Sequence, residues 1–139
     1  HIRIKKLKFI LSFLLKLIKE KKYGLNFTLI KFLCYNPHCS ENKTIGNEDE
    51  IIKRSLSLFK NITGPFSADS SFSNLKKNTL FISTYHDQVL IPFKALNTKM
   101  INITLGLKYR RLSPAHGTAK DIKFKNKANI NSYIECMKI

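Results

Sequence analysis

Three short segments rich in β-branched and aromatic residues recur along the chain, together with segments of helical pattern. These segments are residues 26–38 (NFTLIKFLCYNPH), 78–84 (NTLFIST) and 100–107 (MINITLGL). Such segments are typical of strands, and strands that alternate with helices predict an α/β fold with a layered sheet. Because ligands of such sheets bind at the carboxyl ends of the strands, the polar residues after each segment are the first candidates for a functional site.

Helical spacing of apolar residues occurs in three other parts of the chain, residues 5–22, 51–60 and 126–139. The first predicted helix ends near Gly24, and its buried face is expected to consist of Leu7, Ile10, Leu11, Leu14 and Ile18. Lys8 and Lys16 leave only seven uncharged residues between them, too few to span a bilayer. We therefore expect this helix to pack on a core rather than to enter a membrane.

The chain has 139 residues, which suits one domain with a genuine core. It begins with histidine and not with methionine. We expect it to be part of a longer protein.

The net charge of +16 is compatible with nucleic-acid binding. However, the lysines are spread along the whole chain, and no aromatic residues alternate with a compact basic patch. An A/T-rich coding bias explains the abundance of lysine, isoleucine and asparagine more simply. We therefore expect no nucleic-acid partner, although binding to nucleic acid or an anionic surface remains the alternative.

The three cysteines, Cys34, Cys39 and Cys136, do not follow the spacing of a disulfide framework. Reduced thiols in a cytoplasmic protein are the simplest interpretation. The segment CYNPHC also places His38 beside Cys39, but it lacks the second ligand pair of a zinc finger.

Histidines end or follow several of the predicted strands. Taken alone, each is most simply a structural or surface residue, but imidazoles that converge from separate strand ends are a common way to build a catalytic divalent-metal site. Asp69 or Asp87 is available to orient an imidazole ring. Lys94, Asn102 and Arg111 together suit a phosphate or a carboxylate, although solvated side chains are the simpler reading from spacing alone.

Several of these motifs, in this order, resemble the 4-hydroxythreonine-4-phosphate dehydrogenase family of pyridoxal phosphate biosynthesis. The collinear motifs are HIRIKKL, NPH, GPFSADSSF, YHDQ with a lysine eight residues after its histidine, NITLGL, an arginine, HGTA with a nearby aspartate, and NKAN before SYI. The resemblance extends over residues 1–139 and implies the C-terminal portion of such a chain, without its N-terminal half. It also implies a partial α/β/α layered sandwich of the isocitrate/isopropylmalate dehydrogenase-like type.

The resemblance assigns roles to individual residues. Its metal ligands correspond to His1, His38 and His86, and its substrate-binding residues correspond to Lys94, Asn102 and Arg111. The implied catalytic residues are His86 and Lys94. The loop along the dinucleotide implies five cofactor-binding residues, His116, Gly117, Thr118, Asp121 and Asn129.

The implied activity is NAD-dependent oxidation of 4-phosphohydroxy-L-threonine at its hydroxyl group, followed by decarboxylation, with NADP as the other possible cofactor. It requires a divalent metal such as zinc, magnesium or cobalt. The family works as a cytoplasmic homodimer in which the partner subunit completes each active site. The alternatives are an inactive truncated relic and a dehydrogenase of four-carbon acid-sugar phosphates.

The segment after NPH departs from the family pattern. Where the family has the glycine-rich AGEGGHMG, residues 39–46 read CSENKTIG. The chain therefore lacks three of the four glycines of a flexible loop next to a predicted metal ligand.

Overall fold

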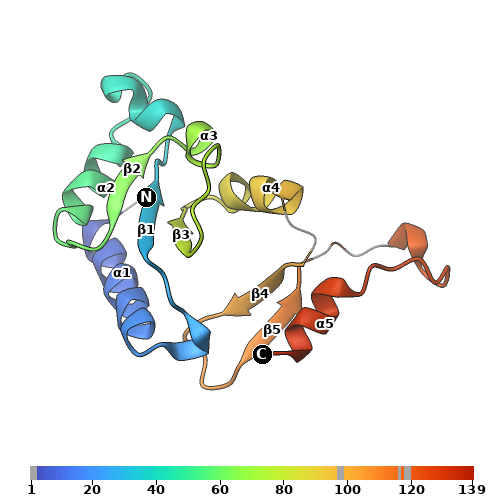
Figure 1. Cartoon of the computed structure of the whole chain (residues 1–139). Helices are drawn as coiled ribbons and strands as arrows, with labels where there is room; N and C mark the ends of the chain where they lie inside the picture. Colours follow the sequence, from blue (N-terminus) through green and yellow to red (C-terminus); the bar gives the residue numbers. More distant parts are fainter. Residues whose placement is uncertain (1–2, 97–98, 116, 118–119) are drawn as a thin grey trace. The chain divides into compact units, whose positions relative to one another are not determined.

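The computed structural model describes residues 3–96, 99–115, 117 and 120–139 (Figure 1). The chain divides into two compact units, His1–Leu90 and Ile91–Ile139.

The first unit contains a parallel sheet of three strands, β1 (Leu29–Leu33), β2 (Thr63–Phe66) and β3 (Thr79–Ile82). The strand order is β2-β1-β3, and β1 pairs in parallel with both neighbours. Two of these strands, β1 and β3, confirm the strands predicted at residues 26–38 and 78–84. The α/β fold class is confirmed by this parallel sheet and the helices packed on it.

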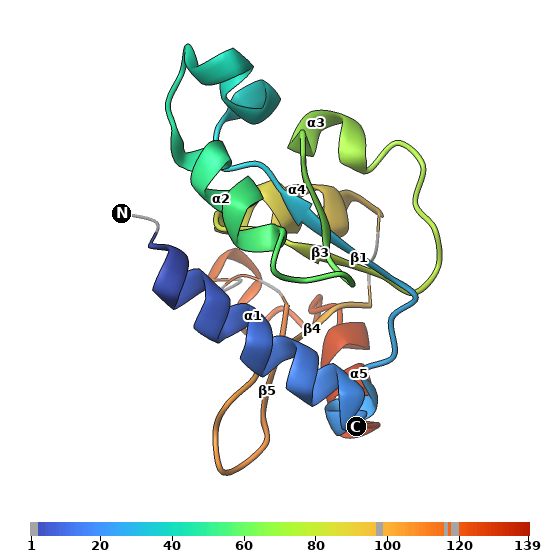
Figure 2. The same ribbon diagram turned by 90° about the vertical axis from the view of Figure 1, so that its left-hand side faces the viewer.

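Two helices, α1 (Ile4–Lys19) and α2 (Glu48–Leu56), cover one face of the sheet. Figure 2, which is turned toward that side, shows both helices in front of the strands. Period-2 alternation directs Ile30 and Phe32 of β1 toward these helices. The buried cluster that results consists of Leu11, Ile30, Phe32, Ile52, Leu56 and Ile62.

The buried face of α1 is only partly the one predicted. Leu7, Leu11 and Ile18 belong to the core or pack against it, as expected. Ile10 is 47% exposed, so its predicted burial was wrong, and the buried Leu17 was missed. The core takes a narrower stripe of the helix than its many apolar residues suggested. No helix among the described residues is long and apolar enough to cross a membrane.

The second unit contains an antiparallel pair of strands, β4 (Ile101–Thr104) and β5 (Arg111–Pro114). The helix α5 (Asn131–Met137) contacts both strands. Strand β4 and helix α5 confirm two predicted elements. Helix α4 (His86–Leu96) contains the boundary between the units, and the shorter elements are α3 (Ala68–Ser71) and the 3-10 segments Lys22–Gly24, Pro37–Lys43 and Lys120–Ile122.

The sequence did not predict β2 and β5, because both contain residues that normally interrupt strands. Strand β2 includes Gly64 and Pro65, and β5 ends at Pro114. Proline is tolerated at the edge of a sheet, which is where β2 lies. Gly64 has a φ of +135°, and an added Cβ would lie 2.5 Å from the carbonyl oxygen of Phe32. Only glycine allows β2 to approach β1 this closely.

Candidate functional site

The two segments that carry predicted metal ligands meet at the carboxyl-terminal ends of the parallel strands. Because β1 and β3 run in the same direction, the chain leaves both strands at the same edge. The rings of Tyr35 and Tyr85 lie there with their centroids 4.8 Å apart. Gln88 Nε2 donates a hydrogen bond to the carbonyl oxygen of Cys34 at 2.8 Å. The segments that carry His38 and His86 are therefore held together by direct contacts.

His86 is the first residue of α4, and its imidazole is exposed. Its Nδ1 donates a hydrogen bond to Asp87 Oδ1 at 2.8 Å. A proton on Nδ1 leaves the lone pair of Nε2 available for a metal ion. The predicted role of Asp87 in orienting an imidazole is thus compatible with the geometry.

His38 lies in a left-handed turn that is unusual for its length. Six consecutive residues without glycine, His38 to Lys43, have φ between +41° and +77°. A side chain in this conformation costs about 1–2 kcal/mol, except in asparagine, which tolerates it better. The family pattern has glycine at three of these positions, those of Ser40, Asn42 and Lys43. The backbone therefore has the conformation of a glycine-rich loop without the glycines that make it easy to form.

A buried carboxylate anchors this turn to α2. Asp49 accepts hydrogen bonds from the backbone N–H groups of Tyr35 at 2.6 Å and Asn36 at 3.0 Å, and from Ser40 Oγ at 2.6 Å. Asn36 Nδ2 donates to Ser40 Oγ at 3.0 Å. These bonds fix the backbone on both sides of His38. The sequence does not point to Asp49, because its partners are up to 14 residues away and no local pattern connects them.

A disulfide between Cys34 and Cys39 encloses the same segment. The expectation of three reduced thiols is therefore wrong for this pair, whereas Cys136 is free as expected. The turn brings the two Cα atoms to 5.1 Å, within the range that a disulfide spans.

Asp69, at the start of α3, is a carboxylate whose pKa is lowered mainly by hydrogen bonds within its own turn. Hydrogen bonds from Ser67 Oγ at 2.6 Å and from the backbone N–H of Ser70 at 2.9 Å lower the pKa of Asp69. The charge of protonated His38 contributes further in the same direction. The sequence suggests Asp69 as an orienting group, but its hydrogen bonds are to Ser67 and Ser70 and not to an imidazole ring.

Tyr85 has the largest pKa shift of the site. Hydrogen bonding to Tyr35 is the main cause, and together with desolvation and nearby negative charge it raises the pKa of Tyr85 to about 12. The Tyr85 hydroxyl therefore stays protonated at physiological pH, and the contact between the two segments includes an uncharged tyrosine side chain.

A complete three-ligand metal site is not assembled within the described part of the chain. There, no group of three histidine, cysteine, aspartate or glutamate side chains is arranged to hold a metal ion. His1 lies outside the described residues. Imidazole nitrogens such as those of His38 and His86 are donors that suit zinc, and the His86 ring has a carboxylate partner in Asp87.

The predicted anion-binding residues Asn102 and Arg111 lie on one face of the β4–β5 ribbon. Thr104 is the cross-strand partner of Arg111 and lies two residues after Asn102, so all three side chains are directed to the same side. Arg111 Nη1 donates to Thr104 Oγ1 at 2.9 Å, and Asn102 and Arg111 are both exposed. A guanidinium oriented in this way is able to bind a phosphate bidentately. Thr104 was not among the predicted residues, although its spacing of two residues from Asn102 places both side chains on the same face of a strand.

The remaining predicted residues lie in less organised surroundings. Lys94 is exposed on α4, just over two turns after His86. Gly117 and Asp121 are exposed, and Asn129 Oδ1 accepts a hydrogen bond from the backbone N–H of Asn131 at 3.0 Å, next to the start of α5. His116 and Thr118 lie outside the described residues.

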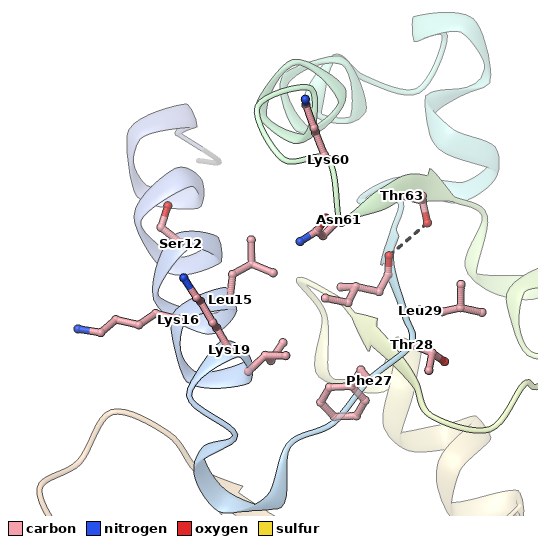
Figure 3. A pocket seen from close by; sticks show the side chains of 12 residues that line it. Ser12, Leu15, Lys16, Lys19, Phe27, Thr28, Leu29, Lys60, Asn61 and Thr63 are labelled. Atoms are coloured by element: carbon pink, nitrogen blue, oxygen red, sulfur yellow. Dashed lines mark hydrogen bonds between the residues drawn. The ribbon is translucent and has the colours of Figure 1, made fainter.

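In the first unit, a cavity of about 800 Å³ lies between α1 and the amino-terminal ends of β1 and β2 (Figure 3). Apolar side chains such as Leu15 and Phe27 form part of its wall, and Lys16, Lys19 and Lys60 also line it. No predicted site residue contributes to it. Its size alone does not make it the functional site, because ligands of parallel sheets bind at the opposite, carboxyl-terminal ends of strands.

Comparisons with known proteins identify relatives of the chain. The chain is 41% identical over 126 residues to a 4-hydroxythreonine-4-phosphate dehydrogenase of Sulfurihydrogenibium sp. (strain YO3AOP1), covering 86% of this chain and 39% of the relative. It is 47% identical over 122 residues to the enzyme of the same name from Campylobacter fetus subsp. fetus (strain 82-40), covering 81% and 40%. This chain thus spans about two fifths of the length of these relatives.

The fold agrees as well. A crystal structure of 4-hydroxythreonine-4-phosphate dehydrogenase from Klebsiella pneumoniae matches with a TM-score of 0.73 and 27% identity, covering 99% of this chain and 43% of the other. The corresponding structure of a putative enzyme from Salmonella typhimurium matches with a TM-score of 0.69 and 27% identity, covering 99% and 44%. The family model of the pyridoxal phosphate biosynthetic protein PdxA matches residues 1–139. The chain belongs to the PdxA family.

Proposed function

We propose that the chain contributes metal-binding and substrate-binding residues to a dehydrogenase that oxidises 4-phosphohydroxy-L-threonine at its hydroxyl group, with NAD or NADP, and then releases carbon dioxide. The proposal is carried by the contacts between the His38 and His86 segments at the carboxyl-terminal ends of β1 and β3. These contacts are the packing of the Tyr35 and Tyr85 rings against each other and the hydrogen bond from Gln88. Sequence identity to the named dehydrogenases supports the same reaction class.

The metal donors in this proposal are His38 and His86, with His1 as the third by family resemblance. Asp87 holds the His86 ring with Nδ1 protonated, so Nε2 is the donor atom. A bound divalent cation supplies Lewis-acid polarisation of a substrate oxygen.

The phosphate of the substrate is bound by the ribbon face of Asn102, Thr104 and Arg111. The contact with Thr104 orients the Arg111 guanidinium before substrate arrives, which lowers the entropic cost of binding. Lys94 adds a second cation in this proposal. Binding of the phosphate positions the hydroxyl-bearing carbon for hydride transfer to the nicotinamide.

The assembly of the whole enzyme is part of the proposal. We take the fold to be a partial sandwich of the isocitrate/isopropylmalate dehydrogenase-like type, and the working form to be a cytoplasmic homodimer with shared active sites. Gly117, Asp121 and Asn129, together with His116 and Thr118, are the cofactor-binding residues of the proposal.

A complementation assay tests the function. The chain is co-expressed with the N-terminal portion of a relative, and NADH formation is followed with 4-phosphohydroxy-L-threonine and a divalent metal. We expect His38→Ala and His86→Ala to abolish turnover and metal binding. Arg111→Ala is expected to raise KM for the phosphorylated substrate by about one to two orders of magnitude. The control variant Arg110→Ala should leave KM nearly unchanged, because the Arg110 guanidinium donates instead to the carbonyl oxygen of Ile139.

The same assay separates this proposal from its competitors. A complemented protein with neither metal binding nor turnover contradicts the proposal and favours an inactive relic. Turnover of four-carbon acid-sugar phosphates without turnover of 4-phosphohydroxy-L-threonine changes the substrate but keeps the reaction class. Both NAD and NADP are supplied in parallel.

A further inference from the structure

The disulfide encloses the His38 segment in a small ring. Cys34 follows directly after β1 and is 1% exposed, whereas Cys39, within the left-handed turn, is partly accessible. The ring between them contains Tyr35, Asn36, Pro37 and His38. Any change in the bond between the sulfur atoms therefore acts directly on the backbone that carries His38.

A cavity of about 530 Å³ gives access to one of the two sulfur-bearing residues. Cys39 lines it, and Cys34 does not. The cavity wall also carries the cations Lys43 and Lys53, for which the described part of the chain shows no ion pair. Of the two carboxylates of the wall, Glu50 is paired with Arg54, and Asp49 is buried beneath three hydrogen-bond donors, so the exposed charges of the wall are mainly those of the two lysines. The surroundings of Cys39 thus favour a small anionic molecule.

We infer that Cys39 is a thiol–disulfide exchange site for an anionic low-molecular-weight thiol of the glutathione class. The thiolate of the small molecule attacks Cys39 Sγ, the bond from Cys39 to Cys34 breaks, and Cys34 leaves as a thiolate that takes up a proton. A second small thiol then attacks the mixed disulfide and releases Cys39 as a thiol. The net reaction converts the protein disulfide and two small thiols into two protein thiols and one small disulfide.

The redox state then sets the conformation of the segment from His38 to Lys43. The turn holds six side-chain-bearing residues in the left-handed region, and the disulfide is one of the constraints that keep it there. Reduction removes that constraint and lets the turn relax. An effect on metal binding by His38 rests on the proposed function, whereas the exchange reaction and the relaxation do not.

The exchange reaction is tested by counting thiols in the folded chain after equilibration with mixtures of glutathione and its disulfide. We expect one alkylatable thiol, Cys136, in the oxidised form and three in the reduced form, with full reversibility. A bond that glutathione reduces only when a denaturant unfolds the chain overturns the inference. So does a chain that keeps three thiols in excess glutathione disulfide.

The direction of attack and the role of the cations are tested by rates. Lys43→Gln and Lys53→Gln are each expected to slow reduction by glutathione about two- to fivefold, an effect that falls as salt is added. They leave reduction by the uncharged 2-mercaptoethanol unchanged. Lys60→Gln, at an exposed lysine that does not line this cavity, is the matched control and has no effect. The inference also requires the trapped mixed disulfide to be on Cys39, and a mixed disulfide on Cys34 contradicts it.

The conformational consequence is tested by hydrogen exchange of individual amides. The N–H of Ile45 donates to the carbonyl oxygen of Ser40, and that of Thr44 donates to Glu41. We expect both amides to exchange at least tenfold faster after reduction, while the amide of Phe32 in β1 is unchanged. Cys39→Ser, which leaves Cys34 in the core, should behave like the reduced chain, and Cys136→Ser like the wild type. Equal protection in the oxidised, reduced and Cys39→Ser forms refutes the conformational part.

Discussion

Replacing Lys43 by glycine is expected to stabilise the protein. Lys43 has a φ of +77° and an exposed side chain for which the described residues show no hydrogen bond or ion pair. A non-glycine residue in this conformation costs about 1–2 kcal/mol, which glycine avoids. Glycine also has more backbone freedom to lose on folding, a cost of about 0.5–1 kcal/mol. The difference is a net stabilisation of about 1 kcal/mol.

The measurement is urea unfolding of the oxidised chain, followed by circular dichroism because the sequence contains no tryptophan. Lys43→Ala is the matched control, since it removes the same charge but keeps the Cβ atom that causes the strain. Lys8→Gly, in the interior of α1, should destabilise by about 1 kcal/mol because its backbone is helical. The reasoning is refuted if Lys43→Gly is no more stable than Lys43→Ala.

Three further predictions concern other parts of the first unit. Absorbance titration should show the hydroxyl of Tyr85 ionising near pH 12. Because folding raises this pKa, the stability that the hydroxyl contributes is present below pH 10 and is lost as the pH rises to about 12. Tyr85→Phe should remove this pH-dependent loss. Asp49→Ala should destabilise by about 2–4 kcal/mol in urea unfolding, because it leaves buried and partly buried donors without their acceptor. The change Glu50→Gln, at a half-buried side chain whose partner Arg54 is exposed, should stay within about 0.5 kcal/mol. Leu11→Ala should lower the free energy of unfolding by about 2–5 kcal/mol, because the Leu11 side chain is 0% exposed. Phe9→Ala should lower it little, because Phe9 is 73% exposed. Equal losses of stability at the two positions would contradict the core assignment.

The elements that the sequence predicted well are those whose signal is local. Strand β1 lies in a segment rich in β-branched and aromatic residues, and α1 repeats apolar residues at helical spacing along its length. Strand β2 was missed because Gly64 and Pro65 are strand breakers by themselves, and only the neighbouring β1 explains why they fit. The burial of Ile10 was wrong for a related reason, since the helical pattern does not say which of several apolar stripes faces the sheet.

The candidate site shows the same division. The sequence identified His38 and His86 by their position at strand ends, and it identified Asn102 and Arg111 by charge and family order. Apart from Asp87, it did not identify the groups that hold these segments. Asp49 and Gln88 act across 9 to 54 residues of sequence, so their partners become visible only in the folded chain.

The strand order β2-β1-β3 has a consequence for how the sheet can grow. In the described part of the chain β1 is paired on both sides, whereas β2 and β3 each have one partner and one open edge. Backbone N–H and C=O groups along an open edge can pair with an additional strand without any change in the strands already present. Both edges belong to strands of only four residues, which limits nonspecific association. Additional strands would therefore pair beside β2 or β3, with β1 remaining in the interior of the sheet. Such pairing leaves the contacts at the carboxyl-terminal ends of β1 and β3 intact.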